Sequence, residues 1–251
     1  MKQLLLPRAY AGEPRVTLSG DDFRHVARVL RMREGDRLGA VDHRGSRYEL
    51  VLLRVGRSDC EASVTPRPFD SGQGRPQARI TLLQCLPKGR KIDLIVRQAT
   101  EAGARRIVLL VSERTVVRPG EADGRTARLT RIAREALQQS GARSLPEIEG
   151  PRPFSCVEEE DWGASLLFHE SPVEGASLHG LLAGGPAAVS LLVGPEGGLS
   201  DAEVARARAA GFRPVHFATG VLRVETAATF ALGAVMTILQ ERDEWTAVQS
   251  E

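Results

Sequence analysis

The stretch LLVGPEGGLSDAEV, residues 191–204, leads from an apolar run into a polar, alanine-containing segment through a turn with three glycines. The run at 187–193 is short, apolar and rich in branched side chains, which is typical of a strand covered on both faces in a parallel sheet. Ser200 is followed three residues later by Glu203, the spacing of a capping box, so a helix is expected to begin after Ser200. Residues 194–199 are therefore predicted to form a strand-to-helix turn.

The glycines of this turn have two interpretations. They permit positive φ and let a ligand approach the main chain closely, but a tight turn needs the same residues for its own geometry. The spacing is not G-x-G-x-x-G, and no Lys-Ser or Lys-Thr pair follows, so neither a dinucleotide site nor a P-loop is indicated. The turn alone does not decide between a structural and a ligand-binding role.

The chain beyond residue 79 alternates apolar runs with helical patterns. Apolar runs lie at residues 80–86, 106–111, 164–168, 187–193 and 215–218, and helices are expected at 91–103, at 125–140 and, buried, at 227–239. This alternation predicts an α/β domain with a largely parallel sheet. Because ligands bind at the carboxyl ends of strands in such sheets, the loops that begin at Phe168, Gly194 and Ala218 are expected to lie together.

The segment PRPFDSGQGRPQAR, residues 66–79, is dense in proline, glycine and polar residues, as is typical of a linker. We expect the domain boundary within it, which gives domains 1–72 and 73–251. Before the linker, short apolar runs lie at residues 38–41, 48–55 and 60–64. Their length and spacing predict a small β-barrel or sandwich.

One helix is expected to interrupt these strands, in DDFRHVARVLRMREGD at residues 21–36. Its apolar face is formed by Phe23, Val26, Ala27 and Leu30. Arg24, Arg28 and Arg31 lie on another face of the same helix. These arginines either contact RNA or are simply solvated.

Basic side chains are concentrated at the front of the chain. The first 79 residues carry 15 basic and 10 acidic side chains, whereas the whole chain has 34 Lys and Arg against 32 Asp and Glu. Arginine is well suited to phosphate and base contacts, but a biased genome composition produces the same enrichment. The charge balance alone therefore identifies no partner.

Several classes of protein are disfavoured. The three cysteines are too scattered for a metal cluster or a disulfide framework, so we expect reduced thiols in a cytoplasmic protein. Pro7 and Arg8 interrupt the apolar start, so no signal peptide is expected. The apolar stretch at 227–239 is too short to span a bilayer, and the five histidines share no metal-ligand spacing.

Six segments of the chain carry a family resemblance. They are HVARVLRMREGD (25–36), QCLPKGRKIDLIVRQATEAG (84–103), SERTVVR (112–118), EALQQSGAR (135–143), GPEGGLSDAEV (194–204) and VLRVETAATFALGAV (221–235). In order and spacing, these segments resemble the RsmE family of 16S ribosomal RNA uridine-N3 methyltransferases, which belongs to the SPOUT superfamily. The resemblance implies a C-terminal α/β domain with a deep trefoil knot, a PUA-like β-barrel in front of it, and a homodimer. It also implies methylation of 16S RNA in the small ribosomal subunit, with S-adenosylmethionine as the methyl donor.

The resemblance further implies where the cofactor binds, because GPEGG is similar to one of the loops that hold S-adenosylmethionine in SPOUT proteins. The implied cofactor contacts are Phe168, His169, Val193, Gly194, Pro195, Glu196, Gly197, Gly198, Phe217, Ala218, Leu222, Thr226 and Ala227. Glu196 is expected to orient a loop or the ribose, or else to act as an ordinary cap. The third loop departs from the usual LG-x-RILRTETA pattern of the family at Ala218, Gly220 and Val224.

The implied chemistry requires a deprotonated uridine N3, whose negative charge spreads onto the flanking carbonyl oxygens. A fixed guanidinium near those oxygens would stabilise this charge, and Arg223 is the candidate. The alternative for Arg223 is a salt bridge to Glu225 or to a partner chain. Glu225 is the candidate proton acceptor, or alternatively a cap for the helix that contains Thr226. Arg8 is the remaining N-terminal candidate for RNA contact, and for the catalytic charge if Arg223 is structural.

Two rival functions are compatible with the sequence. One is a SPOUT methyltransferase that acts on another RNA, such as a transfer RNA, which modification mapping would reveal. The other is a non-catalytic RNA-binding or ribosome-assembly protein, which would fail to bind S-adenosylmethionine.

Overall fold

The computed structural model describes residues 3–67, 78–115, 124–171 and 177–242. The chain divides into two compact units. The N-terminal unit comprises Met1–Gly74 with Arg134–Leu145, and the C-terminal unit comprises Arg75–Ala133 with Pro146–Glu251. The predicted boundary between residues 72 and 73 lies outside the described residues.

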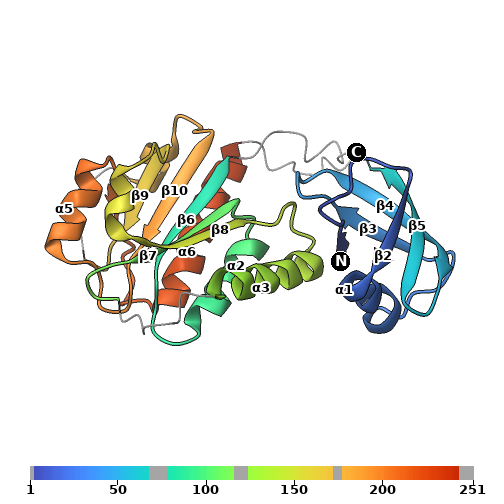
Figure 1. The fold of residues 1–251 in the computed structure, drawn as a ribbon. Helices are drawn as coiled ribbons and strands as arrows, with labels where there is room; N and C mark the ends of the chain where they lie inside the picture. Colours follow the sequence, from blue (N-terminus) through green and yellow to red (C-terminus); the bar gives the residue numbers. More distant parts are fainter. Residues whose placement is uncertain (1–2, 68–77, 116–123, 172–176, 243–251) are drawn as a thin grey trace. The chain divides into compact units, whose positions relative to one another are not determined.

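The N-terminal unit contains one five-stranded sheet, with the strand order β1-β3-β4-β5-β2 (Figure 1). Its strands are β1 (Gln3–Leu5), β2 (Arg15–Ser19), β3 (Arg37–Val41), β4 (Arg47–Val55) and β5 (Asp59–Pro66). β1 pairs in parallel with β3, and the remaining pairs are antiparallel. In β5, partly exposed and buried residues alternate from Asp59 to Val64, as expected of a strand with one face on a core. The small β domain predicted before the linker is confirmed.

The helical part of the segment at 21–36 is shorter than predicted, and most of it is a π-helix rather than an α-helix. It consists of one α-helical turn, α1 (Gly20–Phe23), followed by a π-helical segment, η1 (Arg24–Val29). The backbone N–H of Leu30 donates to the carbonyl of His25 at 2.9 Å, five residues earlier. A period of 3.6 residues therefore does not describe this segment, although Phe23 and Val26 are buried as predicted.

The C-terminal unit is built on a six-stranded sheet in the order β11-β9-β10-β6-β7-β8, and every neighbouring pair is parallel. Its strands are β6 (Arg79–Cys85), β7 (Arg106–Val111), β8 (Glu147–Pro153), β9 (Ala164–Phe168), β10 (Ala188–Val193) and β11 (Arg213–Val215). Its helices are α2 (Lys91–Glu101), α4 (Leu178–Leu182), α5 (Asp201–Ala209) and α6 (Val224–Arg242), with a 3-10 turn η3 at Phe154–Glu158. Helix α3 (Arg125–Ser140) begins in this unit, and its residues from Arg134 onward belong to the N-terminal unit. The predicted α/β domain with a parallel sheet is confirmed.

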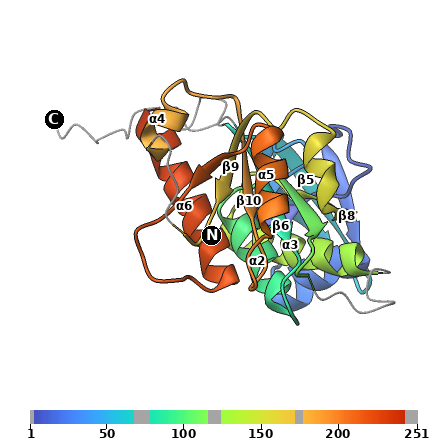
Figure 2. The same cartoon turned by 90° about the vertical axis from the view of Figure 1, so that its left-hand side faces the viewer.

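The sheet is covered on both faces. Leu83 and Cys85 of β6, Leu110 of β7 and Leu192 of β10 share one core cluster with residues of η3 and α5. Figure 2 shows α5 and α6 on opposite sides of β9 and β10. Helices α2 and α6 pack together, and the Thr229 hydroxyl of α6 donates to Gln98 Oε1 of α2 at 2.8 Å. Because both faces are covered, inner strands such as β7, β9 and β10 are mostly apolar runs rather than alternating ones.

The strand order places a switch point at the centre of the sheet. The chain begins the sheet at β6 and runs outward through β7 and β8. It returns on the other side of β6 with β9, then places β10 between β9 and β6, and ends at the edge with β11. Neighbouring strands at such a point send their following loops apart, which leaves a crevice at their carboxyl ends. The loops after β9, β10 and β11 meet at this edge.

Candidate cofactor and active site

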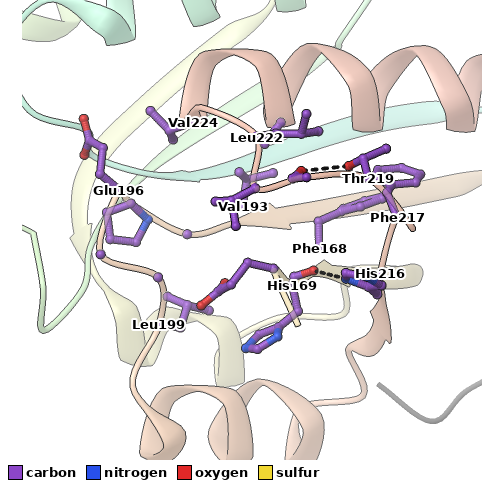
Figure 3. Close-up of a pocket in the computed structure, with 18 residues that line it drawn as sticks. Phe168, His169, Val193, Glu196, Leu199, His216, Phe217, Thr219, Leu222 and Val224 are labelled. Atoms are coloured by element: carbon purple, nitrogen blue, oxygen red, sulfur yellow. Dashed lines mark hydrogen bonds between the residues drawn. The ribbon is translucent and has the colours of Figure 1, made fainter. Parts of the chain in front are cut away.

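A cavity of about 230 Å³ lies at the carboxyl ends of β9, β10 and β11 (Figure 3). Its walls are formed by residues 168–170, 193–199, 216–217, 219–222, Val224 and Ala227. The three loops that were expected to lie together therefore do so. All of these residues belong to the C-terminal unit.

The loop at 194–199 is held by a capping box at its end. Ser200 Oγ accepts from the Glu203 backbone N–H at 3.3 Å, and Glu203 Oε2 accepts from the Ser200 backbone N–H at 3.0 Å. This confirms the predicted start of α5 after Ser200. The other oxygen of the buried Glu203 accepts from the Glu113 backbone N–H at 2.8 Å. The same carboxylate thus connects α5 to the loop that follows β7.

Two glycines of the loop let other side chains approach its backbone. Gly198 has a φ of +69°, and a Cβ atom there would lie 2.6 Å from Oε1 of Glu170, which lines the cavity. Gly197 lies against Arg114, whose Nη1 donates to the Gly197 carbonyl at 2.6 Å. The close approach that the glycines allow is therefore already used by Glu170 and Arg114 of the same chain.

Glu196 makes contacts to the loop that follows β6. Both of its carboxylate oxygens accept from the Lys88 backbone N–H at 3.1 Å, and Oε1 lies 2.7 Å from Lys91 Nζ. Partial burial raises the pKa of Glu196, but the hydrogen bonds from Lys91 and from the backbone outweigh it and hold this pKa below its ordinary value. Of the roles considered for Glu196, these contacts support the orientation of a loop.

Aromatic rings form another wall of the cavity. Phe168 and Phe217 are stacked with ring centroids 5.3 Å apart, and Phe230 of α6 meets Phe217 edge-on at 4.7 Å. His169 also lines the cavity, and its Nδ1 accepts from the Ser171 backbone N–H at 3.1 Å. His216 Nδ1 lies 3.2 Å from the His169 carbonyl oxygen. Both alternatives for His169, a cavity residue and a hydrogen-bonded turn residue, therefore apply together.

Most of the predicted cofactor contacts line this cavity. They are Phe168, His169, Val193, Gly194, Pro195, Glu196, Gly197, Gly198, Phe217, Leu222 and Ala227. Ala218 and Thr226 do not line it, and Thr226 is exposed on α6. The cavity also includes residues that were not among the predicted contacts, namely Glu170, Leu199, His216, Thr219, Gly220, Val221 and Val224. Their one signal in the sequence is that they adjoin predicted residues within the same three loops.

The candidate catalytic residues lie at the start of α6. The Arg223 side chain is exposed and makes no hydrogen bond or ion pair with the residues that the structure describes, so the alternative salt bridge to Glu225 is not formed. The Arg223 carbonyl accepts from the Ala227 backbone N–H at 2.8 Å, which opens the first turn of α6. Glu225 is largely buried, with 17% of its side chain exposed, and its Oε2 lies 4.0 Å from Lys91 Nζ.

The remaining basic candidates belong to the N-terminal unit. Arg8, Arg24, Arg28 and Arg31 are all exposed. Arg24 Nη1 pairs with Asp21 Oδ1 at 3.0 Å, and Arg31 has a φ of +55°. Within the described ranges, no group of three or more His, Cys, Asp or Glu side chains is arranged to hold a metal ion. None of the helices described there has the length and hydropathy needed to cross a membrane.

Comparison with known proteins identifies the class of this chain. A family model described as an RNA methyltransferase domain matches residues 74–236, and one described as an RNA methyltransferase PUA domain matches residues 18–65. The fold and the matched domains therefore define an RNA methyltransferase. The ribosomal RNA small subunit methyltransferase E of Synechocystis is 32% identical over 91% of this chain and 75% of its own length. That of Mycobacterium bovis is 32% identical over 90% of this chain and 87% of its own length.

A solved structure gives the same result. The ribosomal RNA small subunit methyltransferase E of Neisseria gonorrhoeae, bound to S-adenosyl methionine, superposes with a TM-score of 0.80 at 26% identity. The superposition covers 95% of this chain and 98% of that one. The chain belongs to the ribosomal RNA small subunit methyltransferase E family.

Proposed function

We propose that this protein transfers a methyl group from S-adenosylmethionine to N3 of a uridine in the 16S RNA of the small ribosomal subunit. Family membership supports ribosomal RNA methylation, and the ordered motifs at 84–103, 194–204 and 221–235 support the uridine-N3 position. The observation that carries the proposal is the cavity at the carboxyl ends of β9, β10 and β11, which lies within the matched methyltransferase domain.

The residues around the cavity fit S-adenosylmethionine. Val193 and Leu222 offer apolar surface to the faces of an adenine ring. The backbone N–H groups of Val221 and Leu222 donate to no acceptor among the described residues, so they are free for the polar edge of the base or for the ribose. Glu170 is a carboxylate in the wall without a hydrogen bond or ion pair to the described part of the chain, which suits a cationic ligand.

When bound, S-adenosylmethionine supplies an electrophilic methyl group on a sulfonium that is its own leaving group. The task left to the protein is to stabilise uridine N3 without its proton. Arg223 suits this task because its guanidinium is unpaired within the described residues and lies in the loop that borders the cavity. Such a preorganised donor acts on the charge that develops on the uracil oxygens.

The geometry of Glu225 favours a positioning role over a base role. Its Oε2 is buried and accepts no hydrogen bond from the described residues, and the nearest cation is Lys91 at 4.0 Å. A carboxylate in the first turn of α6 also meets the positive end of the helix. We therefore assign the stabilisation of the N3 charge to Arg223 and keep Arg8 as the second candidate for this charge. In this scheme the N3 proton leaves to solvent water.

The proposal includes RNA binding by the N-terminal unit and a homodimer. Arg8, Arg24, Arg28 and Arg31 supply exposed positive charge for phosphate contacts. Phe230 is 46% exposed on α6, which offers an apolar surface to a second copy. Ribosomal RNA as the substrate implies that the protein acts in the cytoplasm.

The test is mass-spectrometric mapping of methylated uridine in 16S RNA from a strain that lacks this protein. We expect one uridine-N3 methyl group to disappear, to return with the wild-type gene, and not to return with an Arg223→Ala variant. An unchanged 16S RNA together with a lost methyl group in transfer RNA would favour the first rival function. Failure of the purified protein to bind S-adenosylmethionine in calorimetry would favour the non-catalytic one.

A further inference from the structure

Lys91 lies between the two loops that carry the cofactor wall and the catalytic candidate. It is the first residue of α2, directly after the loop that follows β6. Its Nζ is 2.7 Å from Glu196 Oε1 in the loop after β10 and 4.0 Å from Glu225 Oε2 at the start of α6. One ammonium group thus faces two carboxylates that are 29 residues apart in the sequence.

Lys91 is the one cation that pairs with either carboxylate among the described residues, although Glu196 also accepts from the Lys88 backbone N–H. The Glu196 and Glu225 side chains are only 24% and 17% exposed, and neither forms an ion pair with another cation among the described residues. Glu225 Oε2 is buried without a hydrogen bond, and Lys91 is the one cation among the described residues that lies within 4.0 Å of it. The Lys91 side chain is 38% exposed, so the arrangement is only partly buried. Its removal still leaves the largely buried Glu225 carboxylate without a cation among the described residues, which is more damaging than the loss of a fully exposed pair.

The two carboxylates belong to segments with different tasks. Glu196 lines the cavity within the loop at 194–199. In α6, Val224 directly before Glu225 and Ala227 two residues after it line the same cavity. Arg223 lies two residues before Glu225, so the position of Glu225 determines where the Arg223 backbone enters the helix. A contact that fixes Glu225 relative to Glu196 therefore fixes the catalytic candidate relative to the cofactor wall.

We infer that Lys91 is a positioning residue. Through Glu196 and Glu225, it holds the cofactor loop at 194–199 and the start of α6 in fixed positions relative to each other. The expected effect of Lys91 on the methylation rate rests on the proposed function. Its expected effect on cofactor binding rests on the contacts of Lys91 alone. A purely exposed ion pair would have much smaller effects, because such pairs change an equilibrium by less than about fivefold.

The experiment compares Lys91→Gln, Lys91→Arg and a control, Arg206→Gln. The control removes an exposed ion pair, in which Arg206 Nε lies 3.2 Å from Glu158 Oε1 and both side chains are about half exposed. We expect Lys91→Gln to weaken S-adenosylmethionine binding in calorimetry by about tenfold or more, the range typical of coupled contacts. Its single-turnover rate should fall while the KM for RNA stays unchanged. Lys91→Arg should recover most of both properties, and Arg206→Gln should behave as wild type.

The same Lys91 change in a protein that already lacks both carboxylates shows whether Lys91 acts through them. In a Glu196→Gln, Glu225→Gln protein, the added Lys91→Gln change should alter cofactor affinity by less than about twofold, because the groups it holds are already neutral. Wild-type affinity in the single Lys91→Gln variant, or an equal loss in both backgrounds, would overturn the inference. A wild-type protein that binds the cofactor but methylates no ribosomal RNA would overturn the proposed function, while the affinity measurements would still decide the role of Lys91. A wild-type protein that does not bind the cofactor would overturn both.

Discussion

Replacement of Gly198 by alanine separates the structural role of the loop at 194–199 from its role in binding. Gly198 has a φ of +69°, a conformation that costs an L-residue about 1 kcal/mol or slightly more. The added Cβ would also lie 2.6 Å from Glu170 Oε1. That oxygen is at the end of an exposed side chain, so Glu170 can rotate away with little further loss of stability.

The expected effect on stability is therefore small, and the effect on binding is larger. A loss of about 1 kcal/mol lowers the melting temperature by roughly 2–4 °C in a chain of this size. Displacement of Glu170 removes a carboxylate from the cavity wall. Since a hydrogen bond to a charged group contributes about 1.5–3 kcal/mol, the affinity for S-adenosylmethionine should fall by about tenfold or more.

The matched control is Gly211→Ala. Gly211 has a φ of +92°, and a Cβ there would meet no atom within 4 Å, so this variant carries the backbone strain without the contact. Scanning calorimetry should show similar melting temperatures for the two variants, whereas titration calorimetry should show weaker cofactor binding for Gly198→Ala alone. A Glu170→Ala, Gly198→Ala double variant should bind no more weakly than Glu170→Ala. Retained affinity in Gly198→Ala, or equal losses in both glycine variants, would refute this reasoning.

Three further predictions concern catalysis, RNA binding and assembly. Arg223→Ala should lower the single-turnover methylation rate by about a hundredfold or more while changing cofactor affinity far less. Arg223→Lys should recover part of the rate. Wild-type rates in both variants would mean that Arg223 has a structural role. Replacing Arg24, Arg28 and Arg31 together with alanine should weaken RNA binding and leave cofactor affinity intact. The dependence of log affinity on log salt concentration should become shallower by roughly one unit per lost phosphate contact. Unchanged RNA binding would mean that these arginines are merely solvated. Light scattering should give a dimer mass at assay concentrations, and a monomer mass that does not change with concentration would exclude the homodimer.

The sequence determined the local elements of the C-terminal unit. The apolar run before GPEGG, the Ser200 and Glu203 capping box and the bounds of α3 are all as predicted, because they depend on residues within a few positions of one another. Strand β8 could not be recognised, since its sequence EIEGPRP contains a glycine and two prolines. An edge strand tolerates such residues, and only the strand order of the folded sheet shows that β8 is at the edge.

The tertiary structure alone decided which side chains connect the loops of the site. Lys91 and Glu196 are 105 residues apart, and Glu113 and Glu203 are 90 apart. The first pair joins α2 to the loop after β10, and the second joins the loop after β7 to α5. Glu170 lies close to Gly198 and lines the same cavity. No periodicity of the sequence encodes these contacts, because they arise from the order in which distant parallel strands pair. The pairing is set by the burial of both faces of the sheet. Local sequence patterns predict that a strand is buried on both faces, but they do not predict which strand is its neighbour.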